Sequence, residues 1–176
     1  MRKYLKYALL LVLTGCASVP VTHRKQLSLV PESELIQSSK VAYETFLKEN
    51  TVMSPYNTNT LMVKRVGEKL SKACEAFLRE HSDISRIEGF EWEFNLVQDP
   101  QKNAWCMPGG KVVVYEGILT TTFDETGLAV VLSHEIAHAI ARHGNERVSQ
   151  QMLSQYGGSA VQVLLGGAQY QGMDLS

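Results

Sequence analysis

The sequence predicts an α+β fold in which helices pack on a small β-sheet. Before residue 81, apolar residues recur at the three- and four-residue spacing of amphipathic helices. From residue 90 to 96 the spacing changes to strict alternation, which is typical of a half-buried strand. A long apolar segment then begins near residue 128 and is too long for one strand. The order helix, helix, strand, strand, helix is therefore expected, within one folded domain.

Two helices are predicted in the first half of the chain. The first follows Pro31, has acidic residues in its first turn, where the helix dipole favours negative charge, and ends at about Glu49. A loop then runs from residue 50 to 58, and a second helix extends from about Thr60 to Glu80. The apolar residues of this second helix fall on one face, and packing in the core explains that face more simply than a ligand site does. They are Leu61, Val63, Val66, Leu70, Ala73, Cys74, Phe77 and Leu78.

Two strands are expected between residues 90 and 115. The first covers 90–96, and a turn at 98–102 follows it. Residues 105–108 lead into Gly109-Gly110, and Lys111–Tyr115 forms the second strand. An exposed strand here, around residues 105–114, could pair with an extended peptide through backbone hydrogen bonds. Gly109 and Gly110 allow close backbone approach, and a simple turn is the equally weighted alternative.

A further helix is expected to begin after Asp124 and to run to about Arg142. Asp124 is a plausible N-cap, and Gly144 is expected to interrupt or bend the helix after Arg142. Residues 147–156 are predicted to form a further helix or a continuation of this one, with a break at Gly157-Gly158 and another short helix at 160–165.

The pentapeptide His134-Glu135-Ile136-Ala137-His138 lies in this helix and indicates a metal site. Two histidines four residues apart on a helix point the same way, so their imidazole nitrogens can hold one Zn²⁺. Glu135 lies beside the metal without ligating it, where the general base for a metal-activated water belongs. The alternative is two partly buried core histidines. The apolar flanks predict a helix buried on most sides, where polar side chains need partners, and this favours the metal.

The first residues have the pattern of a targeting segment. Arg2, Lys3 and Lys6 precede a short apolar stretch that cannot span a bilayer. Leu13-Thr14-Gly15-Cys16 resembles the lipobox of bacterial lipoproteins. That resemblance implies a signal peptide at 1–15, lipidation of Cys16, and a tether at 16–31 before a domain at 32–176. An ordinary secretory signal is the alternative.

Charge and cysteine content limit the other functions. Loss of the three basic residues of the targeting segment changes the formal net charge from −1 to −4, and no basic stripe remains, so nucleic acid is not an expected partner. Cys74 and Cys106 could form a disulfide in an oxidising compartment, although free thiols are slightly favoured. Nothing in the sequence indicates an oligomeric state.

Three blocks together resemble the HtpX-like zinc metallopeptidases. They are Asn103-Ala104-Trp105-Cys106-Met107-Pro108-Gly109-Gly110, then residues 111–119, then residues 134–147 with Arg142, His143, Gly144 and Arg147. The resemblance covers about residues 60–156 and is more specific than the pentapeptide, because the blocks occur in order and at the expected spacing.

This resemblance implies a zincin-like gluzincin with one Zn²⁺ per chain. His134 and His138 would be ligands, and Glu135 the base. The implied activity is endopeptidase cleavage of misfolded or misassembled envelope proteins. Ala17 after the lipidated cysteine implies anchoring at the periplasmic face of the outer membrane. Substrate contacts are expected at Asn103, Ala104, Trp105, Cys106, Pro108, Gly109 and Gly110.

The family's third ligand, a glutamate on a later helix, has no match in this sequence. On a continuous helix Glu146 would sit too far along the axis, His143 would face about 180° from His134, and Asp174 is in no ligand motif. The third ligand is therefore expected beyond Ser176, with this chain the N-terminal part of a peptidase domain. Two other hypotheses remain: a non-catalytic peptide-binding assembly or chaperone factor, and a lipid-anchored fragment without a stable fold.

Overall fold

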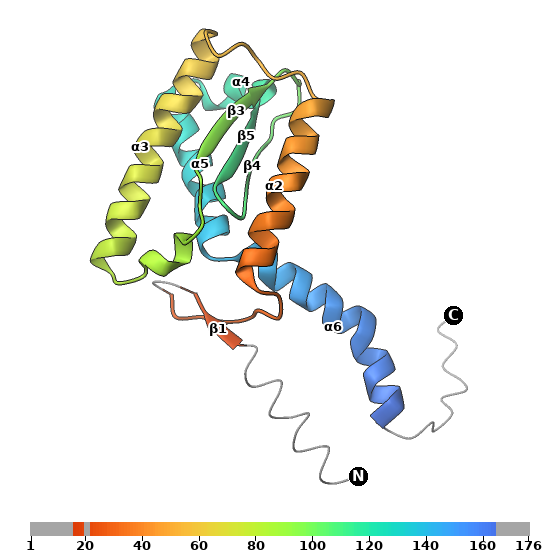
Figure 1. Cartoon of the computed structure of the whole chain (residues 1–176). Coiled ribbons are helices and arrows are strands. Elements are labelled where there is room, and N and C mark those ends of the chain that lie inside the picture. The colour runs from red at the N-terminus through yellow and green to blue at the C-terminus, as the bar shows by residue number, and fades with distance from the viewer. Residues whose placement is uncertain (1–15, 20–21, 165–176) are drawn as a thin grey trace.

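The computed structural model describes residues 16–19 and 22–164 of the chain, with side chains for 17–19 and 22–155. A three-stranded sheet in the order β3-β5-β4 lies at its centre. Helix α2 covers one face of the sheet, and α3 and α5 cover the other (Figure 1). The α+β fold predicted from the sequence is confirmed.

The sheet is built from β3 (Glu93–Val97), β4 (Ala104–Met107) and β5 (Lys111–Tyr115). Strand β5 pairs parallel to β3 and antiparallel to β4, with Ala104 opposite Val114. All five residues of β5 are buried, because helices cover both faces and a strand lies on each side. The second predicted strand is thus confirmed at its bounds, but it is central, and only β4 of the segment 104–115 has a free edge.

The first predicted strand begins three residues later than expected. Phe90 and Trp92 precede β3 and pack against the turn at Gly110, where a side chain would clash with the Trp92 ring. Gly109 and Gly110 have φ of +90° and +79°, a backbone region that glycine enters without a steric penalty. A short 3₁₀ helix, η1 (Ile84–Ile87), fills the preceding segment.

The first two helices agree with the predictions. Helix α2 spans Glu32–Glu49 and α3 spans Thr58–Glu80. Helix α3 begins two residues earlier than expected because the side chain of Asn57 accepts hydrogen bonds from the N–H groups of Asn59 and Thr60. Gly67 faces Phe94 of β3, so α3 lies close against the sheet at that point.

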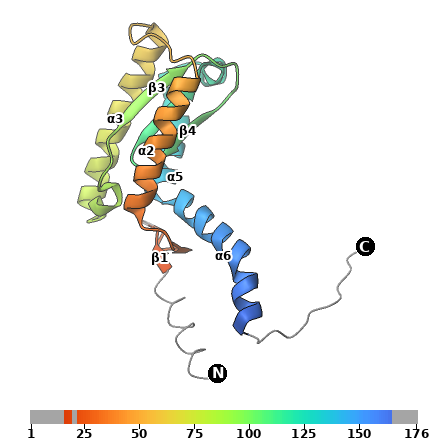
Figure 2. The same cartoon turned by 45° about the vertical axis from the view of Figure 1, so that its right-hand side comes forward.

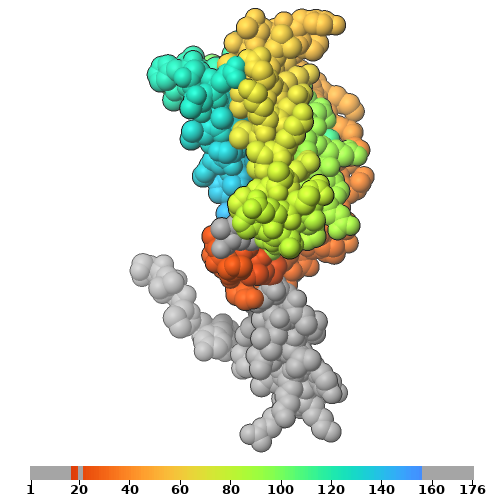
Figure 3. Space-filling model, turned by 90° about the vertical axis from the view of Figure 1, so that its left-hand side faces the viewer, coloured from red at the N-terminus to blue at the C-terminus, as the bar shows by residue number. Residues whose placement is uncertain are grey.

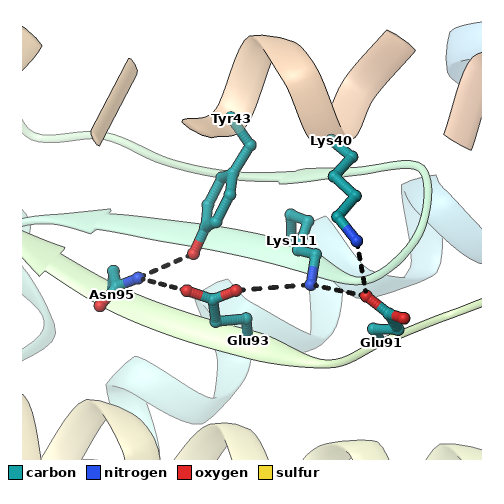
Figure 4. A network of polar contacts seen from close by, with 6 residues as sticks. All are labelled: Lys40, Tyr43, Glu91, Glu93, Asn95 and Lys111. Atoms are coloured by element: carbon teal, nitrogen blue, oxygen red, sulfur yellow. Dashed lines mark hydrogen bonds and ion pairs between the residues drawn. The ribbon is translucent and has the colours of Figure 1, made fainter. Parts of the chain in front are cut away.

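Polar side chains join α2 to its face of the sheet (Figure 4). The buried Lys111 amine lies 3.4 Å from the Glu93 carboxylate and 3.6 Å from that of Glu91. The side-chain nitrogen of Asn95 donates to the hydroxyl of Tyr43 at 2.8 Å. These paired groups let a sheet face covered by a helix carry charge without leaving it unpaired.

Two short turns connect the sheet to the motif helix. They are η2 (Glu116–Ile118) and α4 (Leu119–Thr122). Helix α5 then spans Glu125–Ile140, and Asp124 caps it by accepting from the Gly127 N–H at 2.9 Å, as predicted.

Helix α5 is buried along one stripe and open on its other side. The stripe of Leu128, Leu132, Ile136 and Ala139 packs into the core, whereas Val130 is 66% exposed and His134 also lies at the surface. The prediction of a helix buried on most sides is therefore wrong. Burial alone does not require a metal at these histidines.

The chain after α5 differs most from the prediction. Helix α5 ends at Ile140, Arg142 has a φ of +58°, and α6 (His143–Leu164) starts at the next residue. The break thus lies before Gly144 rather than at it. Helix α6 also continues through Gly157-Gly158, where a break was expected. It leaves the body at the end where the first strands lie (Figures 1 and 2).

Two strands lie within the segment that was predicted to be a tether. Strands β1 (Cys16–Ser18) and β2 (Lys25–Leu27) form an antiparallel hairpin, and β2 contacts α6. Figure 3 shows this hairpin, in red and orange, below one end of α3. The predicted signal peptide, 1–15, lies outside the described residues. Within the described part, no helix has the length and apolar character needed to cross a membrane.

Candidate metal centre

His134 and His138 converge on one point at the surface of α5. Their Nε2 atoms are 2.9 Å apart, and their rings meet edge to face with centroids 4.4 Å apart. This arrangement follows from the helix, which places residues four apart on the same side. The buried stripe of α5 fixes the rotation of the helix about its axis and therefore the direction in which both rings point.

Glu135 lies next to the histidine pair on the side of β4. A cleft of about 320 Å³ separates α5 from the end of β4, and Glu135 and His138 line it together with Cys106 and Pro108. The carboxylate is thus beside the histidine pair and faces a space open to a ligand. That is the position expected for a general base.

Cys74 and Cys106 are free thiols. Burial, together with the smaller effect of the nearby Glu135 carboxylate, raises the pKa of Cys106 to about 12. Burial also raises the pKa of Cys74. Both thiols are neutral at pH 7, which makes them poor nucleophiles. The expectation of free thiols is confirmed.

The residues predicted to contact substrate separate onto two faces of β4. Ala104 and Cys106 point toward α3 and α5, whereas Trp105 points toward α2 and packs edge-on against Phe46 at a ring-centroid distance of 5.1 Å. This follows from the two-residue period of a strand. Of the predicted set, Cys106 and Pro108 line the cleft with Glu135.

The other residues predicted to contact substrate do not line the cleft. Ala104 is buried in the core, and Asn103 is exposed at the start of β4. Gly109 and Gly110 form the tight turn between β4 and β5, and the Ile36 and Trp92 side chains occupy the space above them. The structure thus favours the turn over close substrate approach at these two glycines.

His143 lies at the site, although a continuous helix was predicted to place it about 180° from His134. Because the helix breaks at Arg142, His143 folds back and its Nδ1 lies 2.5 Å from the Nδ1 of His138. Burial, followed by the charge of His138 and Arg24, lowers the pKa of His143. The only sequence signal for this contact was Gly144, which indicated an interruption of the helix in this region.

No third ligand is present in the part of the chain that the structure describes, where no three His, Cys, Asp or Glu side chains gather closely enough to share a metal. Glu146 binds Arg24, with both nitrogen–oxygen distances 2.7 Å. Asp174 lies outside the described residues.

A larger cavity of about 790 Å³ opens on the other side of the histidine pair. It lies between α3, α5 and the N-terminal hairpin, and apolar side chains form most of its wall. His134 and His138 also line it. The pair therefore stands between a polar cleft at β4 and an apolar cavity at α3.

The donor set at this point fits zinc. Two neutral imidazoles are common zinc ligands, and two nitrogens bound to one tetrahedral zinc are about 3.3 Å apart, given bonds of about 2.0–2.1 Å. The observed 2.9 Å between the two Nε2 atoms is within a small side-chain movement of that value.

Comparison with known proteins supports this chemistry. The sequence model of Peptidase family M48 matches residues 61–174, which is more than half of the chain. The chain is 34% identical over 133 residues to the mitochondrial metalloendopeptidase OMA1 of Schizosaccharomyces pombe, covering 74% of this chain and 36% of the relative. It is 29% identical to the Saccharomyces cerevisiae protein of the same name, covering 85% of this chain and 45% of the relative. It is 42% identical over 52 residues to the beta-barrel assembly-enhancing protease of Yersinia pestis, covering 30% of this chain and 11% of the relative.

The matched relatives are thus longer than this chain, which spans less than half of either yeast protein. The matched family region begins at α3 and includes the sheet, α5 and the histidine pair.

Proposed function

The chain belongs to peptidase family M48, and from this premise we propose that it is a zinc-dependent endopeptidase of the bacterial envelope. Its substrates would be misfolded or misassembled proteins. The observation that carries the proposal is the convergence of His134 and His138 beside Glu135, at a cleft bounded by a strand with a free edge.

The residues of the site would have two roles, metal binding and proton transfer. His134 and His138 would hold one zinc ion, which supplies Lewis-acid polarisation of a peptide carbonyl and lowers the pKa of a water. The Glu135 carboxylate would take a proton from the attacking water and deliver it to the leaving amide nitrogen. The new C–O bond would form first, and the peptide C–N bond would break after the nitrogen has received the proton, so that the amine leaves neutral.

Strand β4 would align the substrate. It lies at the edge of the sheet, with β5 on one side only, so its outward N–H and C=O groups can pair with an extended peptide. Such pairing depends on backbone groups and accepts many sequences, which suits unfolded segments. The apolar cavity next to the histidine pair offers surface for side chains that a folded protein would bury.

The proposed location is the periplasmic face of the outer membrane, with lipidated Cys16 as anchor. The Leu13-Thr14-Gly15-Cys16 pattern supports it, and the Yersinia pestis relative shows that similar proteases occur in bacteria. The names of the yeast relatives instead place those proteins in mitochondria. Labelling with a radioactive fatty acid tests the anchor: incorporation that is lost in Cys16→Ser supports it, and an unlabelled wild-type protein contradicts it.

A second candidate function is a peptide-binding assembly or chaperone factor without catalysis. It is favoured by the ligand count in the described residues, which supply two histidines where catalytic zinc sites have three protein ligands. In that case the chain would bind unfolded protein through β4 and the apolar cavity. Measured zinc stoichiometry and cleavage of casein separate the two functions.

The decisive variant is Glu135→Gln. It keeps the size of the side chain but removes the proton acceptor, so we expect zinc binding to persist and cleavage of casein to fall at least about 100-fold. Glu44→Gln, on the exposed side of α2, is the matched control and should cleave like the wild type. Cleavage by Glu135→Gln at the wild-type rate contradicts the role of Glu135. A zinc-free wild type that binds casein without cleaving it supports the second function.

A further inference from the structure

We propose that His143 is a positioning residue that fixes the orientation of the metal ligand His138. The inference rests on the proposed function, because it assigns a role toward the zinc that this function requires. Its basis is the contact between the two Nδ1 atoms at 2.5 Å, with ring centroids 4.8 Å apart and planes inclined by 57°.

The two nitrogens of His138 face different partners. Nε2 points to His134, and Nδ1 points to His143. A neutral imidazole that binds metal through Nε2 carries its proton on Nδ1 and must donate that proton to an acceptor. His143 supplies the acceptor if its own proton is on Nε2. The hydrogen bond therefore runs from Nδ1–H of His138 to Nδ1 of His143.

This geometry excludes His143 as a partner of His134 on the same ion. The contact is to the nitrogen of His138 on the side of the ring away from His134. A ligand of the same metal would instead have to converge on the Nε2 atoms. His143 thus acts through His138 and holds both the tautomer and the plane of its ring.

The position of His143 depends on the break in the helix. Arg142 adopts a φ of +58°, an unfavourable conformation for a residue with a side chain, and its guanidinium lies 3.5 Å from the Glu32 carboxylate. The backbone carbonyl of Ala141 accepts a hydrogen bond from the Gln26 side chain at 2.9 Å. These contacts stabilise the turn that returns His143 to His138.

The N-terminal hairpin completes this support. Arg24 binds Glu146, which is three residues after His143 on the first turn of α6. Asn145 is buried and donates to the carbonyl of Val30 at 2.8 Å. Residues more than a hundred positions before the motif therefore hold the first turn of α6 and, with it, the acceptor for His138.

The first test is zinc affinity, measured by competition with a chromophoric chelator on the full chain. Removal of a hydrogen-bond partner behind a metal ligand typically weakens metal binding 10–100-fold, so we expect the dissociation constant of His143→Ala to rise by about that factor. His143→Asn places an amide oxygen near the position of Nδ1 and should restore most of the affinity, whereas His143→Gln should not. His81→Ala, at the end of α3, is the histidine control and should match the wild type. An affinity of His143→Ala within twofold of the wild type overturns the proposal.

The second test does not require bound metal. Nitrogen-15 NMR of the histidine rings in metal-free protein should show His138 as a single tautomer protonated on Nδ1, and His143→Ala should give a mixture. A mixed tautomer of His138 in the wild type overturns the proposal. If the wild type binds no zinc, the proposed function fails, and the tautomer of His138 still decides the role of His143.

Discussion

The two ends of helix α5 are held by contacts of different origin. At the N-terminal end the cap comes from Asp124, the residue immediately before the helix. At the C-terminal end the Ala141 carbonyl is bound by Gln26, which precedes it by 115 residues. The histidine pair and Glu135 lie near the second end. The part of the helix that carries the chemistry is therefore the part that depends on distant residues.

Both ends also carry an arginine–glutamate pair. Arg65 of α3 binds Glu125 at the start of α5, and Arg24 of the hairpin binds Glu146 on the first turn of α6. The charge pairs are similar, but only the second supports the turn beside His138. Changes at the two ends should therefore differ in their effect on the site more than in their effect on stability.

Loss of Asn145 should have the largest effect. Asn145→Ala removes a buried side chain whose amide donates to the Val30 carbonyl, and leaving a buried hydrogen-bond partner unsatisfied costs about 1–3 kcal/mol of unfolding free energy. Because Asn145 holds the first turn of α6, zinc affinity should fall as well. Urea unfolding and zinc titration of the same variant measure both quantities. Lower stability with unchanged zinc affinity would show that the second end does not support the site.

Loss of the Asp124 cap should have a smaller effect, confined to stability. Asp124→Ala leaves the Gly127 N–H without its acceptor and should lower the unfolding free energy by about 1 kcal/mol. Zinc affinity should not change, because the histidine pair lies more than two turns further along. Asp124→Asn keeps a capping oxygen and serves as control. A clear loss of zinc affinity in Asp124→Ala would contradict the statement that only the C-terminal end of α5 supports the metal site.

Neutralising either arginine should have the smallest effect, visible in acid. The guanidinium partners lower the pKa of Glu125 and of Glu146 from the ordinary 4.5. In the unfolded chain these partners are lost, so both carboxylates bind protons more readily than in the folded protein. The stabilisation is present above pH 4.5 and is lost as the pH falls through the lowered values.

Arg24→Gln and Arg65→Gln should each flatten the fall of unfolding free energy below pH 4.5, and 1 M salt should reduce the difference from the wild type. Urea unfolding between pH 3 and 6 measures it. Only Arg24→Gln should also weaken zinc binding. Equal losses of zinc affinity in the two variants would contradict the expected difference between the two ends of α5.

Local signals in the sequence predicted most of the fold. The periodicity of residues 32–49 and 60–80, the run Lys111–Tyr115 and the cap at Asp124 all depend on near neighbours, and the structure confirms them. The pentapeptide likewise predicted a convergent histidine pair, because four residues of helix place both rings together.

The parts that the sequence could not predict depend on contacts between distant residues. The break at Arg142 has no glycine or proline at the residue that turns, and its stability comes from Glu32 and Gln26. A continuous helix was the expected local structure, and it placed His143 on the wrong side of the site. Residues 16–31 lack periodicity in the sequence, so the packing of β2 against α6 could not be predicted either.

The proposed metal site consists of His134 and His138 holding one zinc ion. Zinc bound per chain, measured by atomic emission after dialysis against low micromolar zinc, tests it in the wild type, His134→Ala, His138→Ala and the control His81→Ala. We expect about one zinc in the wild type and the control, and loss of that zinc in both site variants. Wild-type zinc content in His138→Ala would contradict it.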